Sequence, residues 1–361
     1  MPCRHDRADM TAPGDIPGDV PEDAPVWNPD GTGPAGESSE ALAGPARGAQ
    51  RVQGRFLNPD GTRAGQTRRA LWRLSREPAG PPWPEWVEDP PQPPPAEPPP
   101  GHVAVTFIGH SSFLLRFAGG PSLLTDPVWS ERCSPFAFAG PKRVRPPAIP
   151  LEKLPPVDAV LLSHNHYDHM DLPTLRRLYP VPIVTGLGNG AYLARRGMPG
   201  AVELDWWQET PLPGGATATY LPMKHFSART PFDGGRMLWG GFAVRTRDGG
   251  RLIFCGDTAY GPHLAEIGAR LGSFAVGLVP IGAFVPRWFM QVVHVDPAEA
   301  VQARADLRIE TAIAMHFGTF RLTREAFDAP VKGLEAARAA AGLPDTAFRV
   351  PAFGETLILP L

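Results

Sequence analysis

The chain has 361 residues, a formal net charge of −2, 46 prolines and 39 glycines. Its length permits a large hydrophobic core, and its near-neutral charge argues against nucleic acid as a partner. The three cysteines form no Cys-x-x-Cys pair and fit a reducing compartment. The apolar runs are too short to span a membrane and no apolar signal region is visible, so we expect a cytoplasmic protein with at most peripheral membrane contact.

The first hundred residues differ in composition from the rest. Residues 1–50 are rich in Pro, Gly, Ala and charge and cannot bury enough apolar surface to fold alone, so we expect them to be disordered. Residues 51–100 contain polyproline-like stretches such as 90–95, with apolar anchoring groups in the segments 55–59 and 70–74. We expect this Pro-rich segment to pack on the main domain or to link to it, and residues 101–361 to form that domain.

Strand-like and helical patterns follow each other along the main domain. The strand-like runs are 103–108, 112–117, 159–162, 183–185, 217–221, 242–245, 252–255 and 276–280. Helical patterns are found at 172–178, 189–196, 262–271, 297–305 and 324–341. Because several strands come consecutively, the order favours an α/β fold with four layers, in which helices cover two mixed sheets, over a doubly wound parallel sheet.

The most informative motif lies directly after a buried strand-like run, at 157–162. His164, His166, Asp168 and His169 fall within six consecutive positions, although the whole chain has only 10 histidines. Imidazole nitrogens and carboxylate oxygens at the end of one strand suit a borderline divalent metal, above all zinc. Iron or manganese can fill such a site as well.

Four further candidates lie at the ends of predicted elements. His225, Asp257 and His316 follow strand-like runs, and His294 precedes a helix for which Asp296 is a good N-cap. Loops at strand ends meet at one edge of a sheet, where sites in α/β proteins are built. We therefore expect these side chains to join the histidine cluster.

The order His-x-His-x-Asp-His, then a distant His, Asp and His, resembles the metallo-β-lactamase-fold hydrolases. Longer motifs narrow the resemblance to the N-acyl-phosphatidylethanolamine-hydrolysing phospholipase D family. These motifs are at 107–112, 124–127, 140–143, 163–168, 203–207, 256–258, 280–283, 286–290, 294–297 and 316–320. The resemblance spans about 55–355 and implies the four-layer αββα sandwich of that fold, preceded here by a Pro/Gly-rich extension. It also suggests a homodimer.

The resemblance further implies two zinc ions per chain. It assigns His164, His166 and His225 to the first ion, Asp168, His169 and His316 to the second, and Asp257 to both. It implies that a hydroxide shared by the two ions attacks phosphorus, so that N-acyl-phosphatidylethanolamine yields N-acylethanolamine and phosphatidic acid. Asp168, Asp257 and His294 are the candidate catalytic residues.

Other hydrolases remain open, because the same ligands serve attack on a soluble phosphodiester or a lactone. The flanking motifs, rather than the ligands, favour the phospholipid. A β-lactamase is disfavoured, since such enzymes usually lack a bridging carboxylate at the position of Asp257. A non-enzymatic binding module would be expected to have lost ligands, and all seven are present.

Supporting residues are harder to assign from the sequence. Asp126, at a strand end, is our candidate for orienting a ligand histidine, and a simple turn aspartate is the alternative. His110 either contacts substrate or supports the site. His294 could hold a phosphate oxygen or protonate the leaving alkoxide, or it could simply enter the helix.

The stretch 286–290 supplies the candidates for substrate binding besides His294. Arg287 is a plausible phosphate contact, with a solvated surface charge as the alternative. Trp288 and Met290 could line a groove for acyl chains, although such apolar stretches more often belong to a core.

Overall fold

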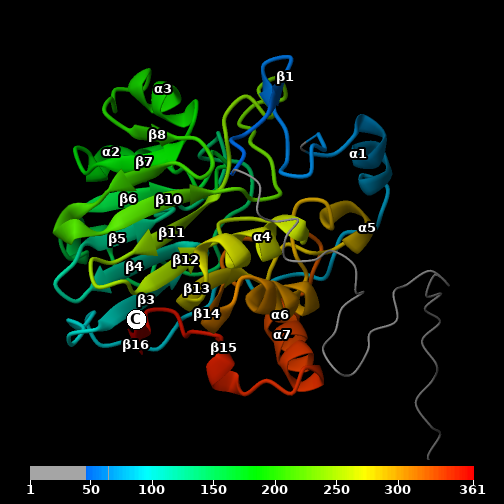
Figure 1. Cartoon of the computed structure of the whole chain (residues 1–361). Coiled ribbons are helices and arrows are strands. Elements are labelled where there is room, and N and C mark those ends of the chain that lie inside the picture. Colours follow the sequence, from blue (N-terminus) through cyan, green and yellow to red (C-terminus); the bar gives the residue numbers. More distant parts are fainter. Residues whose placement is uncertain (1–45, 64) are drawn as a thin grey trace, which may run out of the picture. The chain divides into compact units, whose positions relative to one another are not determined.

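The structure, a computed structural model, describes residues 46–63 and 65–361. Two seven-stranded sheets lie face to face, in the orders β16-β3-β4-β5-β6-β7-β8 and β15-β14-β13-β12-β11-β10-β9 (Figure 1). The strands of the first sheet are β3 His102–Gly109, β4 Ser112–Phe117, β5 Ser122–Thr125, β6 Ala159–Leu162, β7 Ile183–Gly186, β8 Val202–Leu204 and β16 Thr356–Pro360. Those of the second are β9 Glu209–Pro211, β10 Thr217–Leu221, β11 Gly241–Arg245, β12 Arg251–Phe254, β13 Phe274–Pro280, β14 Ile309–Met315 and β15 Phe348–Arg349.

Alternation along the strands explains why both faces of the first sheet are covered. In β4, Phe113 and Leu115 face the core between the two sheets, while Leu114 belongs to a second apolar cluster on the outer face. In β6, Leu161 faces inward and Val160 faces outward in the same way. Successive side chains of a strand point to opposite faces, so such apolar runs require a covering layer on each side.

Helices supply those outer layers. α2 (Leu172–Leu178) and α3 (Asn189–Ala194) contribute Leu175 and Leu193 to the outer cluster of the first sheet. α4 (Pro262–Leu271), α6 (Pro297–Asp306) and α7 (Ala329–Ala340) lie on the side of the second sheet (Figure 1). α5 (Arg287–Met290) is a single short turn, and short 3₁₀ turns are found at Leu151–Lys153, Pro213–Gly215 and Asp345–Ala347. The four-layer αββα sandwich expected from the order of elements is therefore present.

The residues at the N-termini of α6 and α7 explain where these two helices begin. Asp296 forms a capping box with Glu299 at the start of α6, as its position before Pro297 predicted. The helix expected over 324–341 begins only at Ala329, because Pro330 fits a first turn and not a helix interior. The residues before it are engaged elsewhere, since Glu325 accepts hydrogen bonds from the backbone of Ala283 and Phe284.

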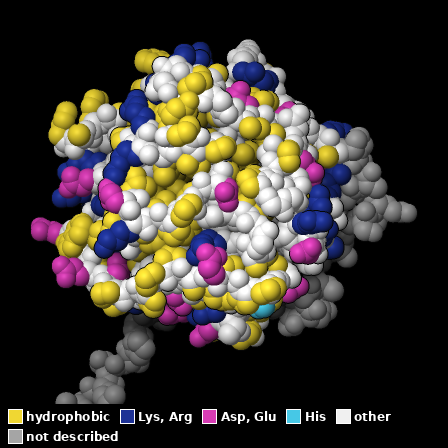
Figure 2. Space-filling view, turned by 90° about the vertical axis from the view of Figure 1, so that its left-hand side faces the viewer, with side chains coloured by type: hydrophobic (Ala, Val, Ile, Leu, Met, Phe, Trp, Pro, Cys, Tyr) yellow, Lys and Arg dark blue, Asp and Glu magenta, His cyan; other side chains and the backbone are white. Residues whose placement is uncertain are grey.

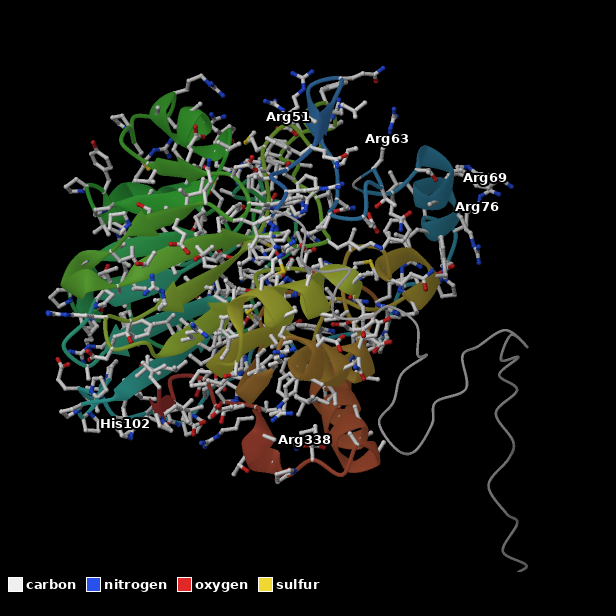
Figure 3. The ribbon with its side chains drawn as sticks, viewed as in Figure 1. Arg51, Arg63, Arg69, Arg76, His102 and Arg338 are labelled. Atoms are coloured by element: carbon white, nitrogen blue, oxygen red, sulfur yellow. The ribbon has the colours of Figure 1, made fainter. Side chains whose placement is uncertain are left out.

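The N-terminal part of the described chain, residues 46–100, lies against the main domain. It contains β1 (Arg51–Val52), β2 (Arg55–Phe56) and α1 (Arg68–Leu74). Trp83 Nε1 donates to the carbonyl of Glu325 at 2.9 Å, and Val87 N donates to the carbonyl of Val144 at 2.7 Å. Figure 3 shows Arg51, Arg63, Arg69 and Arg76 projecting outward from this segment. Of the stretch 1–50 expected to be disordered, residues 1–45 lie outside the described residues.

The surface is mixed in character. On the face shown in Figure 2, basic and acidic side chains are scattered among apolar ones, without an extended field of one charge. Within the part of the chain that the structure describes, no helix is both long and apolar enough to cross a membrane.

Strand direction decides where the loops meet. β5, β6 and β7 run parallel in the first sheet, and β12, β13 and β14 run parallel in the second. The ends of parallel strands lie at one edge of each sheet, and the two edges face each other in the sandwich. The loops after β5, β6, β12 and β14 therefore meet there.

Candidate metal centre

The histidine motif begins immediately after β6, and the distant candidates come from three other strand ends. Asp257 follows β12, His316 follows β14, and His225 follows β10. His316 has a φ of 62°, and Gly256, directly before Asp257, has a φ of 60°. A Cβ on Gly256 would lie 2.8 Å from the Cβ of Ser163, so only glycine lets these two loops approach so closely.

A first group of ligand atoms comes from His164, His166, His225 and Asp257. One nitrogen or oxygen from each lies within 4.8 Å of the others. His166 presents Nδ1, which is 2.9 Å from Nε2 of His164 and 3.2 Å from Nε2 of His225. The four side chains are almost completely withdrawn from solvent, apart from a partly exposed His166.

A second group adjoins the first and comprises Asp168, His169, His316 and His110. Nε2 of His316 lies 3.4 Å from Asp168 Oδ2, and Nε2 of His169 lies 3.5 Å from the same oxygen. Asp257 is a member of the first group and also adjoins the second, because its Oδ2 is 3.1 Å from His169 Nε2 and 3.8 Å from His164 Nε2. A carboxylate in this position can serve two ions at once.

Hydrogen bonds on the far side of the rings hold these histidines. Nδ1 of His225 donates to the carbonyl of Val293 at 2.8 Å, and Nδ1 of His169 donates to Asp126 Oδ2 at 2.6 Å. In the neutral ring, each bond places the remaining lone pair on Nε2, which faces the centre of the cluster. A carbonyl or carboxylate behind a metal-binding imidazole has this orienting effect in metalloproteins.

Asp126 reaches both groups. Besides His169, it accepts hydrogen bonds from the backbone N of Ser163 at 2.7 Å and from Ser163 Oγ at 2.5 Å. Because Ser163 Oγ donates to Asp126, it can only accept from Nδ1 of His164, which lies 2.9 Å away. One buried carboxylate thus contacts His169 directly and His164 through the hydroxyl of Ser163.

His110 lies behind the second group. Its Nε2 is 3.0 Å from Asp168 Oδ2, its ring centroid is 4.1 Å from that of His316, and it is buried. Its carbonyl accepts a hydrogen bond from His316 N at 2.9 Å. These contacts favour a supporting role over direct contact with substrate.

Burial and charge set the protonation of the cluster. Burial, with the neighbouring histidines, lowers the pKa of His166 to about 3, and burial lowers the pKa of His225 to about 4. Burial also opposes protonation of His316, but Asp257 and Asp168 outweigh it and raise the pKa of His316 to about 9. Asp257, Asp168 and Asp126 likewise raise the pKa of His169 well above its usual value. Without metal, protonation of His316 and His169 therefore offsets part of the negative charge of these carboxylates.

The donor set fits two divalent ions. Several buried atoms that face the cluster have no hydrogen-bond partner among the described residues, namely His169 Nε2, His316 Nε2 and Asp257 Oδ1. Buried polar atoms are rarely left without partners, so such a concentration calls for a cation. Nitrogen and carboxylate ligands, three or four to each group, match the number a catalytic zinc site uses while one position stays open.

A cavity of about 590 Å³ opens over the cluster. Its polar floor includes His166, Asp168, Asp257 and His294, and Nε2 of His294 lies 4.0 Å from Asp257 Oδ2. Its walls are largely apolar, and they are formed by Leu71, Phe226, Phe289, Met290, Val293 and Leu322. The cavity can hold an amphiphilic molecule with its polar part at the cluster.

Two of the predicted substrate contacts do not line this cavity. Arg287 is paired with Glu299, lies 3.4 Å from Asp296 Oδ2, and donates to the carbonyl of His294 at 2.7 Å. Its charge is therefore neutralised by the start of α6. Trp288 packs under Arg73 and donates from Nε1 to Glu77 at 2.6 Å. Of this stretch, Phe289 and Met290 line the cavity.

Sequence reasoning missed Asn58. This residue is buried, and its Oδ1 accepts a hydrogen bond from the backbone N of His225 at 3.0 Å. Gly65, Gln66 and Leu71 of the same segment line the cavity. The N-terminal segment thus contributes to the centre, and the only available signal was the motif at 55–59.

Comparison with known proteins agrees with this geometry. The beta-lactamase superfamily domain matches residues 122–317. An uncharacterised protein of Mycobacterium tuberculosis is 40% identical over 65% of this chain and 64% of its own length, so the chain spans less than two thirds of that relative. N-acyl-phosphatidylethanolamine-hydrolyzing phospholipase D 1 of Caenorhabditis elegans is 36% identical over 69% of this chain and 74% of its own length.

A solved structure shares the fold. Isothiocyanate hydrolase from Delia radicum gut bacteria aligns with a TM-score of 0.58 at 22% identity, covering 72% of this chain and 100% of its own. The chain belongs to the beta-lactamase superfamily, and it has the metallo-β-lactamase fold. Within that superfamily it is a homologue of the N-acyl-phosphatidylethanolamine-hydrolysing phospholipases D, as the motifs indicated.

Proposed function

We propose that this protein is a dinuclear zinc phosphodiesterase of the phospholipase D type, which cleaves N-acyl-phosphatidylethanolamine into N-acylethanolamine and phosphatidic acid. The observation that carries this proposal is the apolar cavity of about 590 Å³ directly over a two-group metal centre. The similarity to the Caenorhabditis elegans enzyme supports the same substrate class.

The chain would hold one ion with His164, His166 and His225, the other with Asp168, His169 and His316, and both with Asp257. Two such ions, when bound, activate water and neutralise negative charge on phosphate oxygens. The protein keeps the ligands oriented through Asp126 and the carbonyl of Val293, so the site needs little reorganisation during the reaction.

His294 is suited to contact the substrate phosphate. It lines the cavity beside Asp257, and burial lowers its pKa well below the usual value, so the ring is neutral. A neutral imidazole can donate its N–H to a phosphate oxygen or to the leaving oxygen of the ethanolamine group. The P–O bond to that oxygen breaks as the oxygen of water bonds to phosphorus, and a proton passes to the leaving group.

The apolar walls would hold acyl chains. Leu71 comes from α1, and Phe289 and Met290 come from α5; together they give the cavity an apolar lining next to the polar floor. Burying a chain of methylene groups there contributes roughly 0.8 kcal/mol per group. A small soluble phosphodiester or lactone would leave this lining unused.

Product analysis tests the proposal. Zinc-loaded protein and metal-stripped protein are incubated with N-acyl-phosphatidylethanolamine in detergent micelles, and the products are identified by mass spectrometry. We expect N-acylethanolamine and phosphatidic acid only from the zinc-loaded protein. If protein with two bound metals releases neither product, the substrate assignment is wrong, and soluble phosphodiesters and lactones become the next substrates to test.

A further inference from the structure

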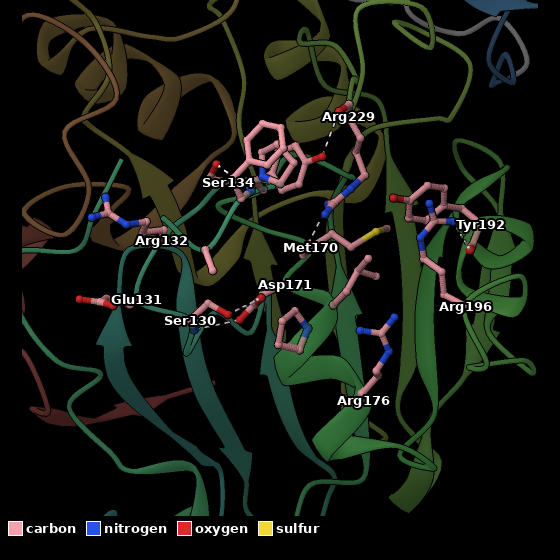
Figure 4. A pocket seen from close by; sticks show the side chains of 16 residues that line it. Ser130, Glu131, Arg132, Ser134, Met170, Asp171, Arg176, Tyr192, Arg196 and Arg229 are labelled. Carbon is pink, nitrogen blue, oxygen red and sulfur yellow. Dashed lines mark hydrogen bonds between the residues drawn. The ribbon is translucent and has the colours of Figure 1, made fainter. Parts of the chain in front are cut away.

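A second cavity of about 460 Å³ lies beside the metal centre (Figure 4). Tyr167 lines both cavities, so they are neighbours. The second cavity is bounded by α2, the end of α3 and the segment 130–137. Four arginines line it, Arg132, Arg176, Arg196 and Arg229.

Arg229 is the buried member of this set, with 8% of its surface exposed. Its Nη1 donates to the carbonyls of Asn165 and Met170, both at 2.8 Å, and its guanidinium carbon lies 3.9 Å from the ring centroid of Tyr167. It forms no ion pair with a carboxylate in the described part of the chain, and its Nε has no hydrogen-bond partner there. A buried guanidinium without a counter-ion is costly unless an anion approaches.

Arg196 adds a second positive charge at close range. Its guanidinium carbon is 3.4 Å from the ring centroid of Tyr192, and that of Arg229 is 5.6 Å from the same centroid. The two cations are therefore no farther apart than the sum of these distances. Arg176, on α2, points toward the same space in Figure 4. Like charges gathered in this way repel one another, and an anion between them removes the repulsion.

The acidic residues of this cavity are already engaged. Asp171 accepts hydrogen bonds from the backbone of Trp129 and from the hydroxyls of Ser130 and Thr174. Glu131 is paired with Lys142 at 2.7 Å. Neither carboxylate is bonded to an arginine of the cavity, so the lining keeps a net positive charge.

We propose that this cavity binds a phosphate monoester, either as a soluble molecule or as the head group of an anionic lipid. Arginine forks match phosphate oxygens in pairs, and three of them approach from separate elements. The volume admits a glycerol phosphate head group. The inference rests on the cavity alone and holds whichever substrate the metal centre cleaves.

The test compares three metal-loaded proteins. The wild type is set beside the double variant Arg176→Gln with Arg196→Gln, and beside a control double variant, Arg177→Gln with Arg195→Gln. The control residues are the immediate neighbours in sequence, carry the same charge and do not line the cavity. Arg229 is left intact because it holds the carbonyls of the metal-binding loop. The metal centre also attracts phosphate, but it is common to all three proteins.

Two probes separate the sources of phosphate. Binding of sn-glycerol 3-phosphate is measured by calorimetry, and binding to phosphatidylcholine vesicles with and without phosphatidic acid is measured by sedimentation. We expect the cavity variant to lose about tenfold or more in affinity for one or both probes, since two charge-assisted contacts are removed. The control variant should bind as the wild type does. A loss with the soluble probe identifies a free phosphate monoester, and a loss confined to vesicles identifies a lipid head group.

Equal binding of both probes by all three proteins would overturn the proposal. Metal content and thermal midpoint are measured for each variant, so that a folding defect is recognised. If the double variant is unstable, the exposed Arg176→Gln alone against Arg177→Gln gives the same comparison, with the same two outcomes.

Discussion

Asp126 offers a sharp test of how the metal centre is held together. Replacing it with Asn keeps the size of the side chain but removes its charge. The carboxylate now accepts three hydrogen bonds, from Ser163 N, Ser163 Oγ and His169 Nδ1. An amide can keep the first through its oxygen, but its NH₂ group then faces two donors and cannot accept from them.

The expected loss follows from these contacts. A hydrogen bond to a charged group contributes about 1.5–3 kcal/mol, and removal of the group that orients a ligand histidine typically costs about 10–100-fold in metal affinity. Asp126 supports His169 of the second group directly and His164 of the first group through Ser163. Asp126→Asn should therefore weaken both ions. Ser163→Ala should weaken mainly the first.

Competition with a chromophoric chelator measures each step of metal binding. Asp171→Asn is the matched control, because Asp171 is also a buried carboxylate with several hydrogen bonds but contacts no ligand histidine. We expect it to lower the thermal midpoint and to leave metal affinity unchanged. If Asp126→Asn binds two ions with wild-type affinity, the orienting role of this carboxylate is refuted.

Three further predictions concern the ligands and the N-terminal segment. Asp257→Asn should abolish nearly all hydrolysis and weaken the binding of both ions, whereas His316→Ala should leave one ion bound. Elemental analysis of the dialysed proteins distinguishes these outcomes. Two ions retained by both variants would contradict the shared role of Asp257. Because the pKa of His316 is raised to about 9, its proton should stabilise the metal-free protein fully below pH 6.5, and this stabilisation should be lost as the pH rises through 9. Over the same pH range, affinity for the second ion should rise, because the ion binds the deprotonated ring. Thermal melts and chelator titrations between pH 6.5 and 9 check this, and a flat affinity profile would count against it. Asn58→Ala should leave the buried N–H of His225 without an acceptor, at a cost of about 1–3 kcal/mol, with weaker binding of the first ion; unchanged denaturant midpoint and metal affinity would show that the contact is dispensable.

Much of the architecture could be predicted from the sequence, because local signals and tertiary structure agree there. The run 159–162 forms β6 with the predicted bounds, and Asp296, Pro297 and Glu299 start α6 as such a triplet should. The seven expected metal ligands come from strand ends, and the parallel strands carry them to one edge. The spacing within 164–169 places four of them in the one short loop after β6, so their proximity does not depend on contacts between distant parts of the chain.

Several of the remaining strands, and some contacts, carried weaker signals. β8, β9 and β15 have only two or three residues each, too few for a period to be recognised. Arg287 is typical of a phosphate contact in sequence, but it pairs with Glu299 because α6 starts beside it. Trp288 likewise turns to Glu77 of the N-terminal segment rather than to the cavity.

By itself, the sequence predicted which side chains could bind metal and identified the superfamily of the chain, since both follow from residue type and spacing. Only the tertiary structure decided which partners stand behind those ligands. Asp126 reaches His169 across 43 positions, and Asn58 reaches His225 across 167. Such pairs depend on how two sheets and an N-terminal segment pack together. The type of a single residue does not indicate which residue far away in the sequence it will contact.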